Sequence, residues 1–83
     1  MEIVLTFDAI KQAANKAKHG YDFADLTAEW FDAAIVTPAH GHRFVALGWF
    51  DGSAIAVIFQ PLGREALAII SMRAANRKER KSL

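Results

Sequence analysis

Near the start of the chain, apolar residues recur with the period of a helix. They occupy the i, i+3, i+4 and i+7 positions Ile10, Ala13, Ala14 and Ala17. This spacing predicts an amphipathic helix whose narrow stripe of mostly small side chains lies close against a sheet. Asp8 is placed to cap the start of this helix, and Gly20 supplies the left-handed residue that commonly follows the end of one.

A second helical pattern follows directly. Phe23, Leu26 and Trp30 fall on one face of it, and Asp22 offers its N-cap. After Ala33 the pattern changes from helical to extended. The sequence therefore predicts two helices in its first half and strands after them.

Alternation with a period of two, or a short apolar run between turn residues, marks five predicted strands. They cover residues 2–7, 34–37, 43–50, 54–59 and 66–71. Asp51 and Gly52 predict a tight hairpin between the third and fourth strands, and Pro61 and Gly63 are predicted to end the fourth. The fourth strand is apolar on both faces, which places it at the centre of the sheet.

The end of the chain is strongly basic. A short helix is predicted over 72–81, in which Arg73, Arg77 and Arg80 are spaced i, i+4 and i+7. On a helix this spacing stacks three guanidinium groups on one face. Guanidinium forks match the geometry of phosphate oxygens, so the pattern indicates a phosphate-bearing partner such as a nucleic acid.

The element order predicts the fold class. It is β-α-α-β-β-β-β-α, which is typical of an α+β domain with an antiparallel sheet packed against two N-terminal helices. The 83 residues, of which 53% are hydrophobic, suffice for a single domain over 1–83.

Composition narrows the function classes. The chain has no cysteine, which excludes thiol chemistry and thiolate-held zinc. The net charge of +1 hides an asymmetry, since residues 1–32 hold three lysines against six acids and residues 71–83 hold five basic residues against one acid. The N-terminal residues lack the basic start of a signal peptide and no apolar run could span a bilayer, so we expect a cytoplasmic protein without membrane contact.

Three motifs in series resemble those of the BrnT toxins. They are Asp8-x-x-Lys11-x-x-x-Asn15-x-x-Lys18-His19-Gly20-x-x-Phe23, then Arg43-Phe44-Val45-Ala46-Leu47-Gly48, and finally Ile69-Ile70-Ser71-x-Arg73-x-Ala75-x-x-x-Glu79-Arg80. The resemblance implies a RelE-like fold and a type II toxin–antitoxin toxin that cleaves RNA, inhibiting translation and growth. It further implies neutralisation by a ribbon-helix-helix (BrnA-like) antitoxin, with operator DNA bound only through the complex.

RNA cleavage without a metal or cofactor needs three contributions. The 2′-hydroxyl must lose a proton, the leaving 5′-oxygen must gain one, and the charged phosphorane must be stabilised. We assign His19 to proton transfer, and Arg64, Arg73 and Arg77 to phosphate binding and charge stabilisation. The residues expected to bind the RNA backbone are the cations Lys11, Lys18, Arg43 and Arg80.

Simpler interpretations stay open for these residues. His19 at a helix end is also favoured by the helix dipole, and the C-terminal arginines also suit a solvated face or the antitoxin. His40 and His42 lack a clear third ligand and indicate a solvated loop rather than a metal site. Trp49 is expected in the core or at a partner surface, with base stacking as the alternative. A binding module without catalysis and a degenerate toxin that binds only its antitoxin remain rival functions.

Overall fold

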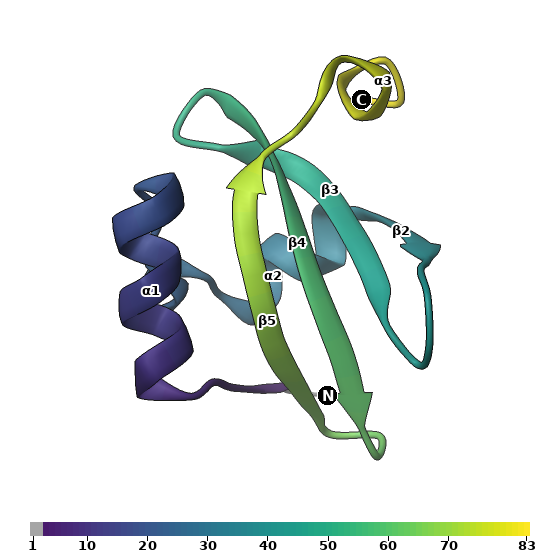
Figure 1. Ribbon diagram of the computed structural model, residues 1–83. Coiled ribbons are helices and arrows are strands. Elements are labelled where there is room, and N and C mark those ends of the chain that lie inside the picture. The colour runs from purple at the N-terminus through teal and green to yellow at the C-terminus, as the bar shows by residue number, and fades with distance from the viewer. Residues whose placement is uncertain (1–2) are drawn as a thin grey trace.

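The computed structural model describes residues 3–83, which form one five-stranded sheet with helices around it (Figure 1). The strands are β1 (Val4–Thr6), β2 (Ile35–Pro38), β3 (Phe44–Phe50), β4 (Ser53–Leu62) and β5 (Ala66–Ala74). The helices are α1 (Ala9–His19), the single 3₁₀ turn η1 (Phe23–Asp25), α2 (Ala28–Ala33) and α3 (Arg77–Arg80). The predicted α+β class is confirmed.

The sheet has the order β1-β5-β4-β3-β2. Strands β2 to β5 form the predicted antiparallel meander, and β4 lies at its centre as expected. β1 differs, because it pairs parallel with β5 over Val4 to Thr6. The predicted first strand began at Glu2, which lies outside the described residues. β1 therefore forms one edge of the sheet, next to β5.

Turn chemistry explains where β4 begins and ends. Asp51 and Gly52 both have positive φ (49° and 79°), as the tight hairpin between β3 and β4 requires. The prediction that Pro61 ends β4 is wrong, because Pro61 pairs with Leu67 inside the ladder. Pairing of β4 with β3 stops at Phe59, so at Pro61 one side of β4 has no partner strand, and a missing N–H is tolerated there.

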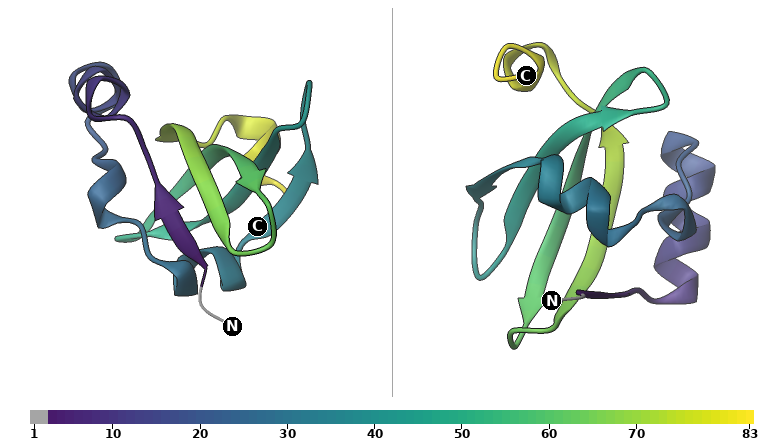
Figure 2. Two further views of the ribbon diagram at one scale, coloured as in Figure 1. Left: turned by 90° about the horizontal axis from the view of Figure 1, so that it is seen from below. Right: turned by 180° about the vertical axis from the view of Figure 1, so that it is seen from behind.

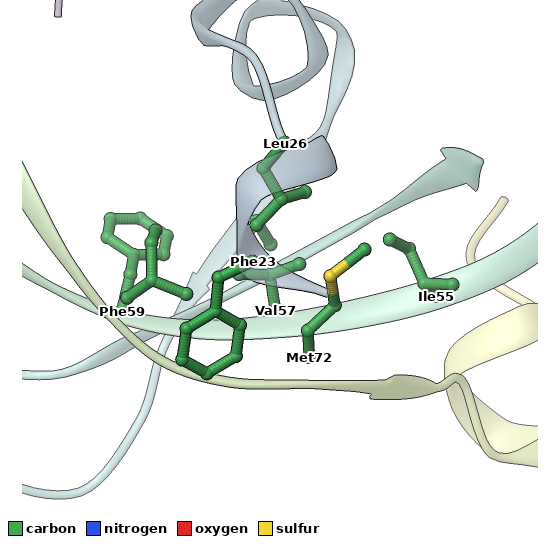
Figure 3. Close-up of a cluster of buried hydrophobic side chains, with 8 residues drawn as sticks. Phe23, Leu26, Ile55, Val57, Phe59 and Met72 are labelled. Carbon is green, nitrogen blue, oxygen red and sulfur yellow. The ribbon is translucent and has the colours of Figure 1, made fainter. Parts of the chain in front are cut away.

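One face of the sheet is covered by η1 and α2. Figure 3 shows the buried cluster between them and the strands, which comprises Phe23, Leu26, Ala46, Ile55, Val57, Phe59, Ile69 and Met72. Trp30 of α2 lies directly over Gly48 of β3, where a Cβ atom would come within 2.9 Å of its ring. A glycine is needed at this position because the indole occupies the space of any side chain.

The second helix differs from the prediction. Asp22 caps only the short turn η1, and the chain is extended again at Leu26 (φ −76°, ψ 146°). Thr27 then caps α2 by accepting a hydrogen bond from the N–H of Trp30 (3.1 Å). Phe23 and Leu26 both reach the core from this short turn, so burying them does not require one continuous helix.

Helix α1 begins and ends as predicted, but the prediction of its buried face is wrong. The Asp8 carboxylate accepts a hydrogen bond from the N–H of Ile10, and Gly20 has φ 79°. The apolar stripe points to solvent instead of the sheet, with Ile10 80% exposed. Asn15 is the buried residue, and its side-chain amide pairs with both backbone groups of Met72 in β5 (2.9 and 3.1 Å). β1 pairs with β5 only as far as Ala68, so the edge of β5 is free of a partner strand at Met72. Its backbone groups need partners there, and Asn15 supplies them.

The predicted helix over 72–81 is also wrong. β5 continues to Ala74, so Arg73 lies in a strand, and only Arg77–Arg80 are helical. Asn76 begins this turn with a capping box in which Glu79 is the reciprocal partner. The stack of three guanidinium groups on one helix face therefore does not exist, because pairing of Met72 to Ala74 with β4 outweighs the local helical pattern.

The face opposite α2 carries the residues of interest. In Figure 1 the viewer looks onto this face, with α1 beside its β5 edge and α3 at its upper end, and Figure 2 shows α2 on the far side. Strand alternation and the register assign to it Val45, Leu47, Trp49, Ala56, Ile58, Gln60, Ala68, Ser71 and Arg73. We call this side the open face.

Candidate nucleic-acid interface

Three adjoining hollows run along the open face from α1 to the loop before β3. The first (about 270 Å³) lies between α1 and β5, and the second (about 300 Å³) lies over the lower ends of β4 and β5. The third (about 440 Å³) lies against the loop after β2. Lys11 and Ile70 line both the first and the second, while Arg43 and Gln60 line both the second and the third. The three hollows therefore adjoin one another, and we call them together the basic groove.

Four of the predicted site residues line this groove. They are Lys11, Lys18 and His19 of α1, and Arg43 just before β3. In residues 3–83 the ion pairs within 4.0 Å are Lys16 with Asp22 and Arg73 with Glu79, so the three groove cations have no carboxylate partner. Asp8 lines the second hollow as well, so the lining holds three cations against one carboxylate. This excess of cations attracts anions, which makes the groove suited to a phosphate backbone.

His19 is the last residue of α1 and lies half-buried beside Lys11 and Lys18 in the first hollow. The helix ends there because Gly20 turns the chain, donating its N–H to the carbonyl of Lys16 (2.9 Å). His19 thus lies at one end of the groove. A positioned imidazole can accept or donate a proton, as RNA cleavage requires.

Arg73 has a carboxylate partner of its own. Its Nη1 and Nη2 donate to the two carboxylate oxygens of Glu79 (2.7 and 3.0 Å), and the two side chains are only 31% and 17% exposed. The bidentate contact raises the pKa of Arg73 and lowers the pKa of Glu79. The guanidinium fork is therefore occupied by a carboxylate that holds α3 against β5.

The other predicted arginines lie at opposite ends of β5. Arg64 is exposed on the turn between β4 and β5, while Arg77 and Arg80 follow the far end of β5. β5 runs from Ala66 to Ala74, which is about 26 Å at the usual rise per residue. One phosphate cannot contact both ends. Arg80 additionally donates to the carbonyl of Ala75 (3.1 Å), which fixes its side chain along the end of β5.

Two features of the groove carry no signal in the sequence. Gln60 lines two of the hollows, although it lies just after the predicted fourth strand and outside the three motifs. A register shift between Ile58 and Phe59 leaves Ile70 as an extra residue in β5, and Ile70 lines the junction of the first two hollows. β-bulges often redirect side chains beside functional sites, but only strand pairing reveals where one forms.

Two further observations concern ligands and membranes. Within residues 3–83, no group of three or more histidine, cysteine, aspartate or glutamate side chains is arranged to hold a metal ion. The helices of the described part of the chain are too short and too polar to cross a bilayer.

Comparison with known proteins identifies the family. The family model for the "Ribonuclease toxin, BrnT, of type II toxin-antitoxin system" matches residues 7–79. This chain belongs to the BrnT family. The crystal structure of the Brucella abortus ribonuclease toxin BrnT is similar to it with a TM-score of 0.81 and 50% sequence identity, over 93% of this chain and 99% of that one. No curated protein sequence matches significantly.

The BrnT-like motifs acquire structural roles in this fold. Asn15 of the first motif ties α1 to β5, and Gly48 of the second lets Trp30 approach β3. Arg73 and Glu79 of the third motif are partners across six residues. Lys11, Lys18, His19 and Arg43, which belong to the first two motifs, line the groove. The motifs therefore combine residues that hold the groove together with residues that line it.

Proposed function

We propose that this chain is a metal-independent endoribonuclease that cleaves single-stranded RNA bound in the basic groove. The observation that carries the proposal is the row of three adjoining hollows whose lining includes His19, Lys11, Lys18 and Arg43. The family membership supports the same reaction class. The RelE-like character of the fold stays part of this proposal.

The chemistry follows from these residues. The 2′-oxygen of the RNA attacks the adjacent phosphorus as its proton leaves, the 5′-oxygen departs and takes up a proton, and a 2′,3′-cyclic phosphate forms. His19 carries a proton in this exchange, and the ammonium of Lys11, which lines the same hollow, stabilises the charge on the phosphorane. Arg43 lines the two neighbouring hollows and binds a flanking phosphate of the strand. Lys18 lies beside His19 and neutralises the phosphate there.

The remaining arginines act outside the groove in this proposal. Arg64 and Arg77 contact the RNA backbone at either end of β5. Arg80 does so from the end of α3, and Arg73 acts through Glu79 by holding α3 in place. This assignment replaces the expected joint action of Arg64, Arg73 and Arg77 at one phosphate.

The proposal extends to the setting of the reaction. A type II toxin has an antitoxin partner, and we infer a BrnA-like ribbon-helix-helix protein that covers the site and binds operator DNA in the complex. Free toxin in the cytoplasm then degrades RNA, which inhibits translation and growth. Non-catalytic RNA binding and binding of the antitoxin alone are the rival outcomes.

The test uses purified wild-type protein and the His19→Ala variant with a single-stranded RNA in EDTA. We expect wild type to yield products ending in a 2′,3′-cyclic phosphate, His19→Ala to bind the RNA but cleave it at least 100-fold more slowly, and a DNA of the same sequence to stay intact. Binding without cleavage by folded wild type, or equal cleavage by His19→Ala, contradicts the proposal. Lys16→Ala is the matched control on the same helix, because Lys16 pairs with Asp22 and does not line the groove.

A further inference from the structure

Trp49 stands apart from the other aromatic residues of the chain. Its side chain is 61% exposed on β3, where strand aromatics are normally buried. We propose that Trp49 is a stacking platform for one nucleobase of the bound RNA, so that it helps to select single strands. This inference deepens the proposed ribonuclease function and rests on it.

The register places Trp49 on the open face. It pairs across the hairpin with Ala54, and its neighbour on the same face of β3, Leu47, pairs with Ala56. Ala56 in turn pairs with Arg73. The residues beside the indole on β4 are thus alanines, whose methyl groups are too short to cover a ring. A planar ligand can lie against the exposed face of the indole.

The backbone beneath Trp49 is fixed from the other side of the sheet. Trp30 Nε1 donates to the carbonyl of Trp49 (3.0 Å), and the Trp30 ring fills the space over Gly48. Phe50 packs edge-on against Tyr21, with ring centroids 6.3 Å apart. These contacts fix residues 48–50 while the Trp49 side chain projects to the open face. A platform that is already ordered loses little conformational entropy when a base stacks on it.

The charge around Trp49 favours a nucleic acid over a protein as its ligand. Just after β5, the N–H of Ala75 donates to the carbonyl of Ala54 (2.9 Å), the residue that pairs with Trp49. The chain then leads into α3 with its basic residues Arg77, Lys78 and Arg80. Exposed apolar side chains near Trp49 on this face are few. Leu47 is buried, whereas Ile35 on the neighbouring strand β2 is 43% exposed. An exposed aromatic ring in the same region as several cations is the usual combination in proteins that bind single strands.

The span to the basic groove suits a short strand of RNA. Arg43 and Trp49 are six residues apart in sequence, mostly along β3, so they are about 20 Å apart at the usual rise per residue. A strand of several nucleotides that has one phosphate at Arg43 can therefore place a flanking base at Trp49. The double helix cannot do so, because its bases are stacked on one another.

The test measures binding of a 2′-O-methyl RNA octamer, which cannot be cleaved, by intrinsic tryptophan fluorescence and by anisotropy. We expect the octamer to quench wild-type emission, and Trp49→Phe, which keeps only Trp30, to show no quenching. Affinity should fall about tenfold or more in Trp49→Ala and much less in Trp49→Phe, since one stacked base carries roughly that much binding. An abasic octamer should bind wild type and Trp49→Ala equally.

Controls separate this inference from the function on which it rests. Ile35→Ala removes a nearby exposed apolar side chain and should bind the octamer as wild type does. Equal affinity of wild type and Trp49→Ala for the base-bearing octamer, both proteins being folded, overturns the stacking role even if wild type cleaves RNA. Loss of antitoxin binding instead of RNA binding in Trp49→Ala also overturns it, in favour of a protein contact. Failure of wild type to cleave any RNA overturns the proposed function. The stacking role then stands or falls by the difference in octamer affinity between wild type and Trp49→Ala.

Discussion

The basic groove and the C-terminal turn both carry arginine or lysine on the open side of the sheet, but their cations differ in partners. Lys11, Lys18 and Arg43 line a hollow and have no carboxylate within 4.0 Å in the described residues. Arg73 is held by both carboxylate oxygens of Glu79. The same charge is therefore left open to a ligand in one region and attaches α3 in the other. Density of basic residues in a sequence cannot distinguish these uses.

The difference also explains why the most basic segment is not the clearest candidate site. An arginine with a bidentate partner must lose that partner before it can hold a phosphate, and the exchange gains little. A lysine or arginine exposed in a hollow loses only bound water when it contacts a phosphate. The predictions below first test how each face of the sheet is held, and those on Arg73, Arg77 and Glu79 then use this contrast between the two regions.

The largest effect is expected at Asn15, which holds the α1 side of the groove to β5. Asn15→Ala would leave the N–H and carbonyl of Met72 without partners, and the free energy of unfolding should fall by about 2–4 kcal/mol, since each unsatisfied buried group costs roughly 1–3 kcal/mol. Urea unfolding followed by circular dichroism measures this. Lys16→Ala on the same helix is the control, and a loss at Asn15 no larger than the control would contradict the account of α1.

A substitution that adds one carbon tests the covered face. In Gly48→Ala the new methyl group would lie 2.9 Å from the Trp30 ring, so Trp30 must move. We expect a loss of about 1–3 kcal/mol in unfolding free energy, as for other overpacked cores. Gly52→Ala is a useful comparison, because no atom lies near its Cβ and only its positive φ opposes the change. Unchanged stability and an unchanged Trp30 environment in Gly48→Ala would show that the contact is not as close as described.

A smaller effect separates Arg73 from Arg77. Arg73→Gln breaks the ion pair with Glu79 and should cost about 1–2 kcal/mol, an amount reduced by partial exposure to water. Arg77→Gln should change stability by less than about 0.5 kcal/mol, because Arg77 is exposed on α3. RNA affinity should show the opposite ranking when corrected for the folded fraction. Thermal unfolding of both variants measures how much each arginine contributes to holding α3 in place. Fluorescence anisotropy with RNA measures how much each contributes to direct RNA binding.

The smallest effect is the pH dependence of the same ion pair. The pKa of Glu79 is lowered mainly by its hydrogen bonds with Arg73, so the pair stabilises the fold above the ordinary pKa of about 4.5. That stability is lost as the pH falls through the lowered value. The difference in unfolding free energy between wild type and Glu79→Gln should be constant above pH 5 and shrink below about 4.5. A difference that does not change down to pH 3 would show that Glu79 contributes nothing through its charge.

Elements fixed by local chemistry were predictable from the sequence. The caps at Asp8 and Gly20 and the hairpin at Asp51 and Gly52 depend on side-chain bonds or positive φ within a few residues. The central position of β4 followed from its apolar residues on both faces. These features do not depend on distant parts of the chain, and the structure confirms them.

Elements fixed by distant pairing were not predictable. Met72 to Ala74 are strand because they pair with residues 55–57 of β4, and nothing in their own pattern opposes a helix. α1 turns Asn15 to the sheet because the free edge of β5 needs hydrogen bonds, although its apolar stripe would have packed elsewhere. The four groove residues were predicted as single site residues. That they line adjoining hollows depends on Gln60 and on the bulge at Ile70.

The most direct test of the central claim compares two double variants that lose the same charge. Lys11→Ala/Arg43→Ala removes two cations from the groove, and Lys16→Ala/Lys81→Ala removes two exposed cations outside it. The measurement is the rate of cleavage of one single-stranded RNA at fixed salt, with folding checked by circular dichroism. If the groove is the ribonuclease site, the first variant should lose at least tenfold in kcat/KM and the second less than about twofold. Equal rates in the two variants would contradict the assignment of the site to this groove.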